Sequence, residues 1–252
     1  MKKLIKILAI VMVVVLSATM LYACGGKEDA TTGREKLIMG TNAAFPPYEY
    51  YEGDKIIGID AEVGALIAEK LDMDFEIQDM DFNGIISAVQ NGVVDIGMAG
   101  MTVREDRLEH VNFSTTYAKG VQVVIVKEGS DIATLDNLAG KKIGVQEATT
   151  GDAYASEDYG EENVKRYTNG AAAVAALQSG IVDAVIIDNE PAKAFVEANE
   201  GLTILETAYA DEDYAIAVAK ENTELLEKIN QALAELTADG SIDAIVNKYI
   251  PA

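Results

Sequence analysis

Two of the four arginines in this chain stand three residues apart, where they could bind an anion together. Arg104 and Arg107 follow closely on an apolar segment at residues 94–99, and Thr102 precedes them. A guanidinium group can hold a carboxylate through two parallel hydrogen bonds, and a hydroxyl group can add another. The same pattern fits a solvated helix start in which the arginines pair with the neighbouring acidic residues. Both interpretations are open from these residues alone.

A second set of polar residues follows apolar segments in the other half of the chain. Asp188 ends the segment 182–188 and could accept an ammonium group, or it could cap a helix that begins near Pro191. Residues 146–151 could bind an anion at a helix start through N–H and hydroxyl groups, or form an ordinary capped turn. A site with both a carboxylate grip and an ammonium acceptor suits a zwitterion, which points to a free amino acid.

The composition excludes several other functions. The 252 residues include 20 Lys and Arg against 42 Asp and Glu, a net charge of −22, whereas nucleic-acid binding needs a basic face. One Cys and one His cannot supply a disulfide framework or a Cys/His zinc site, and we predict no metal and no cofactor. With 49% hydrophobic and 25% charged residues, the chain has the composition of a globular protein.

Apolar strands and amphipathic helices alternate along the chain from residue 36 onward. A short apolar run at 36–41 suits a buried strand, and Asp60 is expected to cap the helix that follows. Another short helix should follow Asn83, and a longer one should extend over residues 222–240, with a last helix over 241–248. This alternation predicts an α/β fold with a mainly parallel sheet covered by helices on both faces.

An internal similarity suggests two lobes of comparable build. Residues 88–98 and 176–186 share five identities in eleven positions, and both run from a helix end through a glycine into an apolar strand. Their separation is too long for a solenoid repeat. Small ligands usually bind in clefts between domains and at the carboxyl ends of strands in open α/β sheets, so we expect the site there.

The first residues have the layout of a secretory signal. Lysines at the start precede an apolar run at residues 7–16, and small residues precede Cys24. A transmembrane anchor is the alternative, but it needs about 20 apolar residues. We therefore predict a signal peptide over 1–23 and a flexible polar tether over 24–35. Residues 21–25 resemble a bacterial lipobox, although Tyr22 replaces the usual small residue, and this resemblance implies a lipid on Cys24.

Further stretches occur in an order that is typical of one family. They lie at residues 45–50, 58–62, 81–86, 99–114, 140–145, 148–151, 182–188 and 214–218. Across nearly all of residues 36–250 the chain thereby resembles the bacterial solute-binding proteins of family 3, the amino-acid receptors of ABC importers. The resemblance implies a two-lobed α/β fold of the periplasmic-binding-protein type II (Venus flytrap) class, with a ligand cleft between the lobes.

The resemblance also implies roles for residues of the first lobe. Arg107 matches the arginine that grips the ligand carboxylate, whereas Arg104 stands where the family often has Thr or Ser. Thr102 and Gly100 match residues that bond the ligand backbone, Gly100 through its carbonyl.

The implied roles in the second lobe complete the amino-acid site. Thr150 and Gly151 match a turn that binds the ligand carboxylate, and Asp188 matches the acceptor of the α-ammonium group. Phe45 and Phe82 match the aromatic walls on either side of the ligand side chain.

Two further positions bear on side-chain specificity. Asn42 stands where family members that bind basic or amide side chains often carry Asp, so a cationic ligand is less favoured without being excluded. Gln146 occupies a variable position that reads the ligand side chain. The identity of the amino acid therefore stays open.

The family topology implies lobe and hinge boundaries. Lobe 1 would comprise residues 36–117 plus 216–252, and lobe 2 residues 122–210. The crossovers at 118–121 and 211–215 would be hinges, about which the lobes close over the ligand.

The function implied is that of a monomeric extracytoplasmic receptor, lipid-anchored to the cell membrane and periplasmic in a cell with an outer membrane. It would bind a free L-amino acid, deliver it to an ABC permease, bind no nucleic acid and catalyse no reaction. The alternative is an enzyme similar to cyclohexadienyl or arogenate dehydratase on the same fold. Such an enzyme needs a general acid in the cleft, and the sequence places none there besides Asp188.

Overall fold

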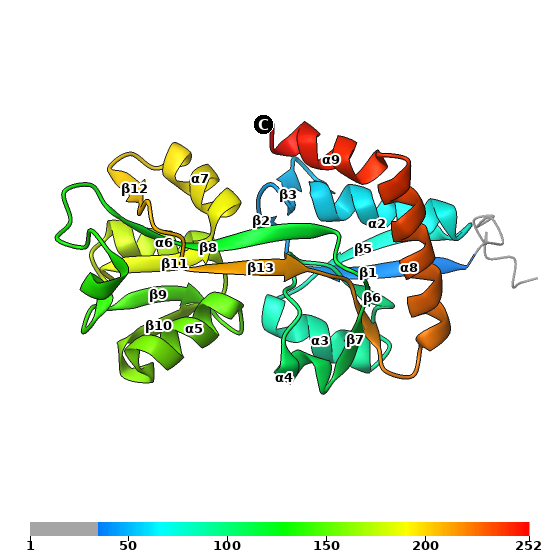
Figure 1. The fold of residues 1–252 in the computed structure, drawn as a ribbon, viewed down its shortest axis with the longest axis horizontal. Coiled ribbons are helices and arrows are strands. Elements are labelled where there is room, and N and C mark those ends of the chain that lie inside the picture. Colours follow the sequence, from blue (N-terminus) through cyan, green and yellow to red (C-terminus); the bar gives the residue numbers. More distant parts are fainter. Residues whose placement is uncertain (1–34, 252) are drawn as a thin grey trace, which may run out of the picture. The chain divides into compact units, whose positions relative to one another are not determined.

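The computed structural model describes residues 35–251, so the predicted signal peptide, Cys24 and nearly all of the predicted tether lie outside the described residues. Within this range the chain forms two mixed sheets, each flanked by helices, and one small hairpin sheet (Figure 1). No helix within residues 35–251 is long and apolar enough to cross a membrane.

The first sheet combines strands from both ends of the described chain. Its order is β5-β1-β6-β14-β7, with β1 (Lys36–Thr41), β5 (Asp74–Asp79), β6 (Ile96–Gly97), β7 (Val111–Phe113) and β14 (Ala217–Ala219). β1 is parallel to β5 and β6, whereas β14 is antiparallel to β6 and β7. In the sheet, β14 therefore lies between β6 and β7, although it follows both by about a hundred residues in the chain. We call the part built on this sheet the first lobe.

Helices bury both faces of this sheet. Leu37 and Met39 lie on one face, because alternate residues of a strand share a face, and they pack with α2 (Ile59–Lys70), α8 (Thr223–Ala238) and α9 (Ser241–Tyr249). On the other face, α3 (Phe82–Gln90) packs Ile85 and Val89 against Ala217. Each buried aliphatic side chain contributes on the order of 2 kcal/mol, so these two faces hold the lobe together.

The second sheet forms the second lobe. Its order is β10-β9-β11-β8-β12, with β8 (Ala118–Lys127), β9 (Ile143–Gln146), β10 (Val164–Tyr167), β11 (Ala184–Asp188) and β12 (Leu202–Ile204). Val123 and Ile125 of β8 face α6 (Gly170–Gln178) and α7 (Asn189–Ala198). Val124 and Val126 pack on the opposite face, in the cluster that includes α5 (Thr150–Tyr159). Burial on both faces explains why residues 123–126 of β8 are all apolar.

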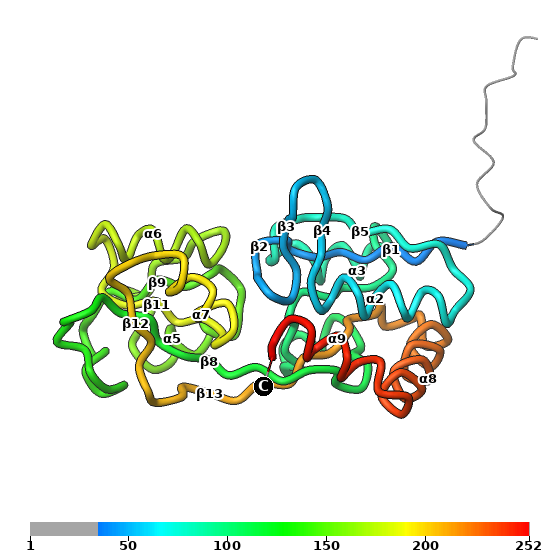
Figure 2. Tube along the Cα trace, turned by 90° about the horizontal axis from the view of Figure 1, so that it is seen from above, coloured from blue at the N-terminus to red at the C-terminus, as the bar shows by residue number. Residues whose placement is uncertain are grey.

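Two strands connect the lobes. β8 and β13 (Ala210–Tyr214) are antiparallel, in a register that runs from Ala118 opposite Tyr214 to Gln122 opposite Ala210. Figure 2 shows the two traces running together between the sheets. Beyond β13 the chain continues into β14, α8 and α9, so it ends in the lobe where it began.

The helix starts partly match the predictions. α8 begins after Asn222, whose side chain accepts a hydrogen bond from the N–H of Leu225, as expected for a cap. The expected cap at Asp60 is wrong, because α2 begins at Ile59 after Gly58. The carboxylate of Asp60 instead accepts a hydrogen bond of 2.9 Å from the N–H of Gly100, and so anchors a loop of the cleft described below.

The remaining elements are short. They are the hairpin strands β2 (Ala44–Phe45), β3 (Glu49–Glu52) and β4 (Lys55–Ile57), the helix α4 (Glu105–Leu108), and the 3₁₀ turns η1 (Leu135–Leu138) and η2 (Glu161–Asn163).

Candidate functional site

A cleft between the lobes collects most of the residues predicted to bind a ligand. Nine of the ten line it: Asn42, Phe45, Phe82, Gly100, Thr102, Arg107, Gln146, Thr150 and Asp188. Gly151 does not line the cleft but lies behind it, where an added Cβ would approach Gln122 Oε1 to 2.9 Å. The free volume of the cleft is about 20 Å³, comparable to one water molecule. An amino acid therefore fits only after the two walls separate.

Direct hydrogen bonds join these walls. Gln146 Nε2 donates to Asn42 Oδ1 at 2.9 Å, and Arg107 Nη2 donates to the carbonyl of Ala148 at 3.0 Å. Nearby, Arg104 Nη1 donates to the carbonyl of Thr149 at 3.1 Å. These three side chains thus find partners across the cleft, whereas both carboxyl oxygens of Glu49 and Oε1 of Gln122 are buried without a hydrogen-bond partner.

Arg107 is a buried cation in the wall of the first lobe. Helix α4 places it so that Nη1 donates to the carbonyl of Thr102 at 2.8 Å, and its guanidinium lies 5.3 Å from the ring centre of Phe82. Burial and the charge of Arg104 lower the pKa of Arg107 to about 10, so it stays charged at neutral pH. A buried charge whose donors reach mainly carbonyl groups is well suited to an anionic partner.

Arg104 behaves differently although it is only three residues away. It forms a two-point contact with Asp106, with hydrogen bonds of 2.9 and 2.8 Å, and it does not line the cleft. The two interpretations of the arginine pair therefore divide between its members: Arg104 pairs with a neighbouring acid, and Arg107 faces the cleft.

Asp188 lies on the opposite wall, at the end of β11. It occupies the N-cap position of α7, but its side chain makes no cap hydrogen bond. Its carboxylate instead accepts hydrogen bonds from Gln122 Nε2 at 2.6 Å and from the hydroxyl of Tyr214. Burial and the charge of Glu212 raise the pKa of Asp188 to about 8. The interpretation of Asp188 as a simple cap fails, because its oxygens point to the cleft instead of to helix N–H groups.

The start of α5 provides N–H donors beside Asp188. Thr149 caps this helix by accepting from the N–H of Asp152 at 3.3 Å, and Thr150 is buried in the cleft wall. Ala148 adopts a left-handed conformation with φ of 64°, which L-residues other than glycine rarely adopt. This turn directs the carbonyl of Ala148 toward Arg107, while the positive end of α5 favours an anion at its first residues.

The two aromatic walls come from different elements of the first lobe. Phe45 belongs to β2 and lies against Gly100, where an added Cβ would come within 2.8 Å of its ring. Gly100 has φ of 53°, so both its conformation and the close ring require glycine. Phe82 begins α3 and carries the cation–π contact with Arg107.

The structure adds residues that the sequence analysis missed. Six more line the cleft: Glu49, Ala99, Gln122, Thr149, Ile186 and Ile187. Gln122 and Glu49 carried a signal, because each is polar within a run of apolar or aromatic residues, and both are almost fully buried. Burial and the charge of Asp60 raise the pKa of Glu49 well above its usual range.

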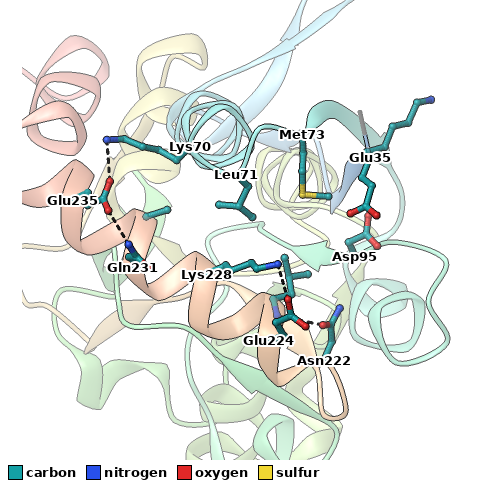
Figure 3. Close-up of a pocket in the computed structure, with 13 residues that line it drawn as sticks. Glu35, Lys70, Leu71, Met73, Asp95, Asn222, Glu224, Lys228, Gln231 and Glu235 are labelled. Atoms are coloured by element: carbon teal, nitrogen blue, oxygen red, sulfur yellow. Dashed lines mark hydrogen bonds and ion pairs between the residues drawn. The ribbon is translucent and has the colours of Figure 1, made fainter. Parts of the chain in front are cut away.

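A larger hollow lies elsewhere, between the end of α2 and α8 (Figure 3). Its volume is about 780 Å³, but several of its charged side chains already have partners: Lys70 pairs with Glu235 at 3.2 Å and Lys228 with Glu224 at 2.7 Å. These pairs are exposed to solvent, where an ion pair contributes little to stability, so they give this hollow no buried charge with which to bind a ligand. Within residues 35–251, no cluster of three or more His, Cys, Asp or Glu could hold a metal ion.

Comparisons with known proteins place this cleft in a family context. Residues 37–252 match the family model for bacterial extracellular solute-binding proteins, family 3. The arginine-binding extracellular protein ArtP of Bacillus subtilis (strain 168) is 33% identical over 237 residues, covering 91% of this chain and 92% of ArtP.

Two solved structures are also similar. An ancestral arginine-binding protein bound to glutamine has a TM-score of 0.82 and 41% identity, and the match covers 87% of this chain and 99% of that one. The arginine-, lysine-, histidine-binding protein ArtJ from Geobacillus stearothermophilus has a TM-score of 0.82 and 33% identity, with 86% and 96% covered.

Proposed function

Because the chain belongs to the bacterial extracellular solute-binding proteins of family 3, we propose that it binds one free L-amino acid between its lobes and delivers it to an ABC importer. The observation that carries this proposal is that one cleft is lined both by the buried guanidinium of Arg107 from the first lobe and by the buried carboxyl of Asp188 from the second. A ligand without a carboxylate would leave the buried charge of Arg107 unpaired, and a ligand without an ammonium group would leave the buried carboxyl of Asp188 without its partner, and both are costly.

Each end of the ligand has its own partners. Arg107 holds the α-carboxylate together with the backbone N–H groups of Thr102 and of the start of α5, where Thr150 lies, since the hydroxyl of Thr102 donates to Glu212. Asp188 accepts the α-ammonium group, and the carbonyl of Gly100 bonds the same group from the first lobe. Gly151 contributes by leaving room for Gln122 behind the site.

The ligand side chain would lie between Phe45 and Phe82 and meet the amide groups of Asn42 and Gln146. These two amides hydrogen-bond to each other across the cleft, so each offers both donors and acceptors once the walls part. A flat hydrogen-bonding side chain suits such a slot, which favours glutamine or arginine. The similarity to ArtP and to an ancestral protein bound to glutamine supports the same two candidates.

Binding would proceed by hinge closure. We assign residues 36–117 plus 216–252 to lobe 1 and residues 122–210 to lobe 2, with hinges at 118–121 and 211–215. The paired strands β8 and β13 are the only connections between the sheets in the described part of the chain, which supports this assignment. The small free volume of the cleft requires the lobes to separate before a ligand can bind.

Titration calorimetry with glutamine and arginine tests the site. We expect Arg107→Lys and Asp188→Asn each to weaken binding at least 100-fold, since removing one member of a buried charge pair costs about 3–5 kcal/mol. Asp183→Asn is the matched control, because Asp183 is exposed on the approach to β11 and does not line the cleft, and it should change affinity less than threefold. Unchanged affinity in both site variants would overturn the assignment.

We further propose that the mature protein is a monomer anchored by lipid on Cys24 after removal of residues 1–23. Tyr22 departs from the usual lipobox residue, so the test is direct. Cells grown with radiolabelled palmitate should label the wild-type protein and not Cys24→Ser. Equal labelling, or none in either protein, would contradict the anchor.

We assign the chain no catalytic step. A dehydratase would need a protonated group in the cleft, and Asp188 is the group that it would use. Incubation with arogenate or prephenate should yield no aromatic product, whereas product lost in Asp188→Asn would establish the enzyme instead.

A further inference from the structure

Two buried carboxyl groups share one amide donor in the wall of the cleft. Gln122 Nε2 donates to Asp188 Oδ2 at 2.6 Å and to Glu212 Oε2 at 3.1 Å. Asp188 is 5% exposed and Glu212 is 4% exposed. Glu212 lies on β13, which connects the lobes, and it does not line the cleft itself.

Neutral groups supply the other contacts of this pair. Thr102 Oγ1 donates to Glu212 Oε2 at 2.8 Å, and Tyr214 donates to Asp188. The second oxygen of Glu212 has no hydrogen-bond partner and is inaccessible to solvent. In residues 35–251, no lysine, arginine or histidine forms an ion pair with either carboxylate. If both were ionised, Asp188 and Glu212 would therefore be two neighbouring negative charges in a buried site without a direct counterion.

More distant groups do not remove this conflict. Arg107 from α4 is the cation whose pKa is affected by the charge of Glu212. In the proposed function, however, Arg107 binds the ligand carboxylate and so does not neutralise the acid pair. The other ionisable groups that interact with the pair are acids and phenols: Glu49, Tyr48, Tyr154 and Tyr214. Like charges in one site raise the pKa of one member, and here burial and then Glu212 raise the pKa of Asp188.

From this geometry we infer that Glu212 is a positioning residue that keeps a proton on Asp188 until the ligand ammonium group replaces it. The inference rests on the proposed function of Asp188. The exchange is balanced: one ammonium cation binds to the carboxylate, and one proton leaves the Asp188 carboxyl for the solvent. No covalent bond other than that O–H bond changes. The pair would thereby accept a cation only in exchange for a proton.

The exchange predicts how affinity depends on pH. Below the pKa of Asp188 the proton must be removed on binding, so the dissociation constant should fall up to tenfold for each pH unit gained. Above that pKa the carboxylate is already free, and the dependence should level off. The α-amino pKa of a free amino acid lies at about 9, above the range of about 7.7–8.0 for a chain terminus, so the ligand amine stays mostly protonated over roughly pH 6–8.5.

Calorimetry in buffers of different ionisation enthalpy counts the protons released. For wild-type protein with glutamine or arginine we expect about one proton per ligand near pH 6.5 and clearly fewer near pH 8.5. Glu212→Gln should lower the count near pH 6.5 and flatten the pH profile of affinity. Glu147→Gln is the matched control. Glu147 Oε2 accepts a hydrogen bond of 3.2 Å from Asn83 Nδ2 and makes no contact with the Asp188–Glu212 pair, so the proton count of this variant should equal that of wild type.

The outcomes separate the inference from the proposed function. If neither amino acid binds, and a screen of the remaining ones finds no ligand, the proposed function fails. If a ligand binds without proton release at any pH, the exchange is overturned while the function stands. An unchanged count in Glu212→Gln overturns the role of Glu212. Weakened binding with an unchanged pH profile would show that Glu212 is merely structural, and the wild-type pH profile alone keeps the exchange testable if that variant does not fold.

Discussion

Arg107 and Asp188 illustrate how burial changes what an ordinary charged residue can do. Both are nearly inaccessible to solvent, and both have their ionisation displaced toward the neutral form. For Arg107 the displacement leaves the charge intact at neutral pH, whereas for Asp188 it removes the charge. Under the proposed function, Asp188 is therefore the residue that must lose a proton and regain its negative charge when the ammonium group of the ligand binds.

This displacement makes a prediction for the stability of the ligand-free protein. The pKa of Asp188 rises from an ordinary value of about 3.9 to about 8, so its contribution to stability is full below about pH 4 and is lost as pH rises through about 8. Asp188→Asn keeps the neutral form at every pH. We expect it to match wild type near pH 4.5 and to be more stable by a few kcal/mol near pH 9.

Urea denaturation of both proteins at the two pH values measures this difference. Asp183→Asn serves as the control, because Asp183 is an exposed aspartate on the approach to the same strand. A constant difference between Asp188→Asn and wild type from pH 4.5 to 9 would contradict the assignment.

Sequence could identify these residues only in part. Asp188 ends an apolar segment and Arg107 follows one within eight residues, a position that marks ligand contacts in α/β folds, but only the family resemblance distinguishes Arg107 from Arg104. Glu212 is one of three consecutive acids in the segment 211–213, and nothing in that segment distinguishes it from its exposed neighbours. Its burial comes from the pairing of β13 with β8, which is a long-range contact.

At the scale of elements, the β8–β13 pair brings the site and the connection between lobes together. Gly120 of β8 lies opposite Glu212, and a Cβ at this position would lie 2.2 Å from the Tyr214 hydroxyl and 2.4 Å from Asp188 Oδ1. The absence of a side chain is what lets Tyr214 and Asp188 meet over the strand. A methyl group at this point would push both away.

Gly120→Ala should therefore weaken amino-acid binding at least tenfold. Displacing Tyr214 and Asp188 would cost their hydrogen bonds, which are worth about 1–3 kcal/mol each. Gly84→Ala in α3 is the control, because no atom lies within 4 Å of the added Cβ and the helix tolerates alanine. Calorimetry and thermal denaturation of both variants check this. Equal affinities would mean that Tyr214 and Asp188 move without loss.

The elements themselves followed from local patterns more reliably than their ends. Helices α3 and α8 and strand β1 were predictable because their apolar periodicity is strong. The cap of α2 was not, because Asp60 has the usual cap chemistry but a stronger partner in Gly100, some 40 residues away. Such competition between a local and a distant partner leaves no trace in a short window of sequence.

At the scale of the whole molecule, the cleft walls make hydrogen bonds that the ligand must replace. Asn83 and Gln146 contribute contacts between lobes in addition to those of the arginines. Closure therefore has a stabilising component of its own, and the affinity for ligand is reduced by whatever it costs to break these contacts.

Small-angle scattering tests the lobe motion. A compact chain of 252 residues has a radius of gyration of about 18 Å. We expect saturating ligand to bring the protein nearer to that value than it is in the ligand-free state, because the ligand joins the two walls. Arg107→Lys at the same ligand concentration should not contract. An identical radius for wild type with and without ligand would argue against hinge closure.

The return of the chain to its first sheet also constrains the order of folding. β8 to β12 are contiguous in the chain, so the second lobe can form from local contacts once its last strand is available. The first sheet needs β14, and its core needs α8 and α9, all of which follow the second lobe in the chain. Contacts between segments so distant in sequence slow folding, because loop closure must precede them. A chain made from its N-terminus would therefore leave the first lobe unfinished until residues 217–249 are available, although β1 of that lobe is the first strand of the described chain.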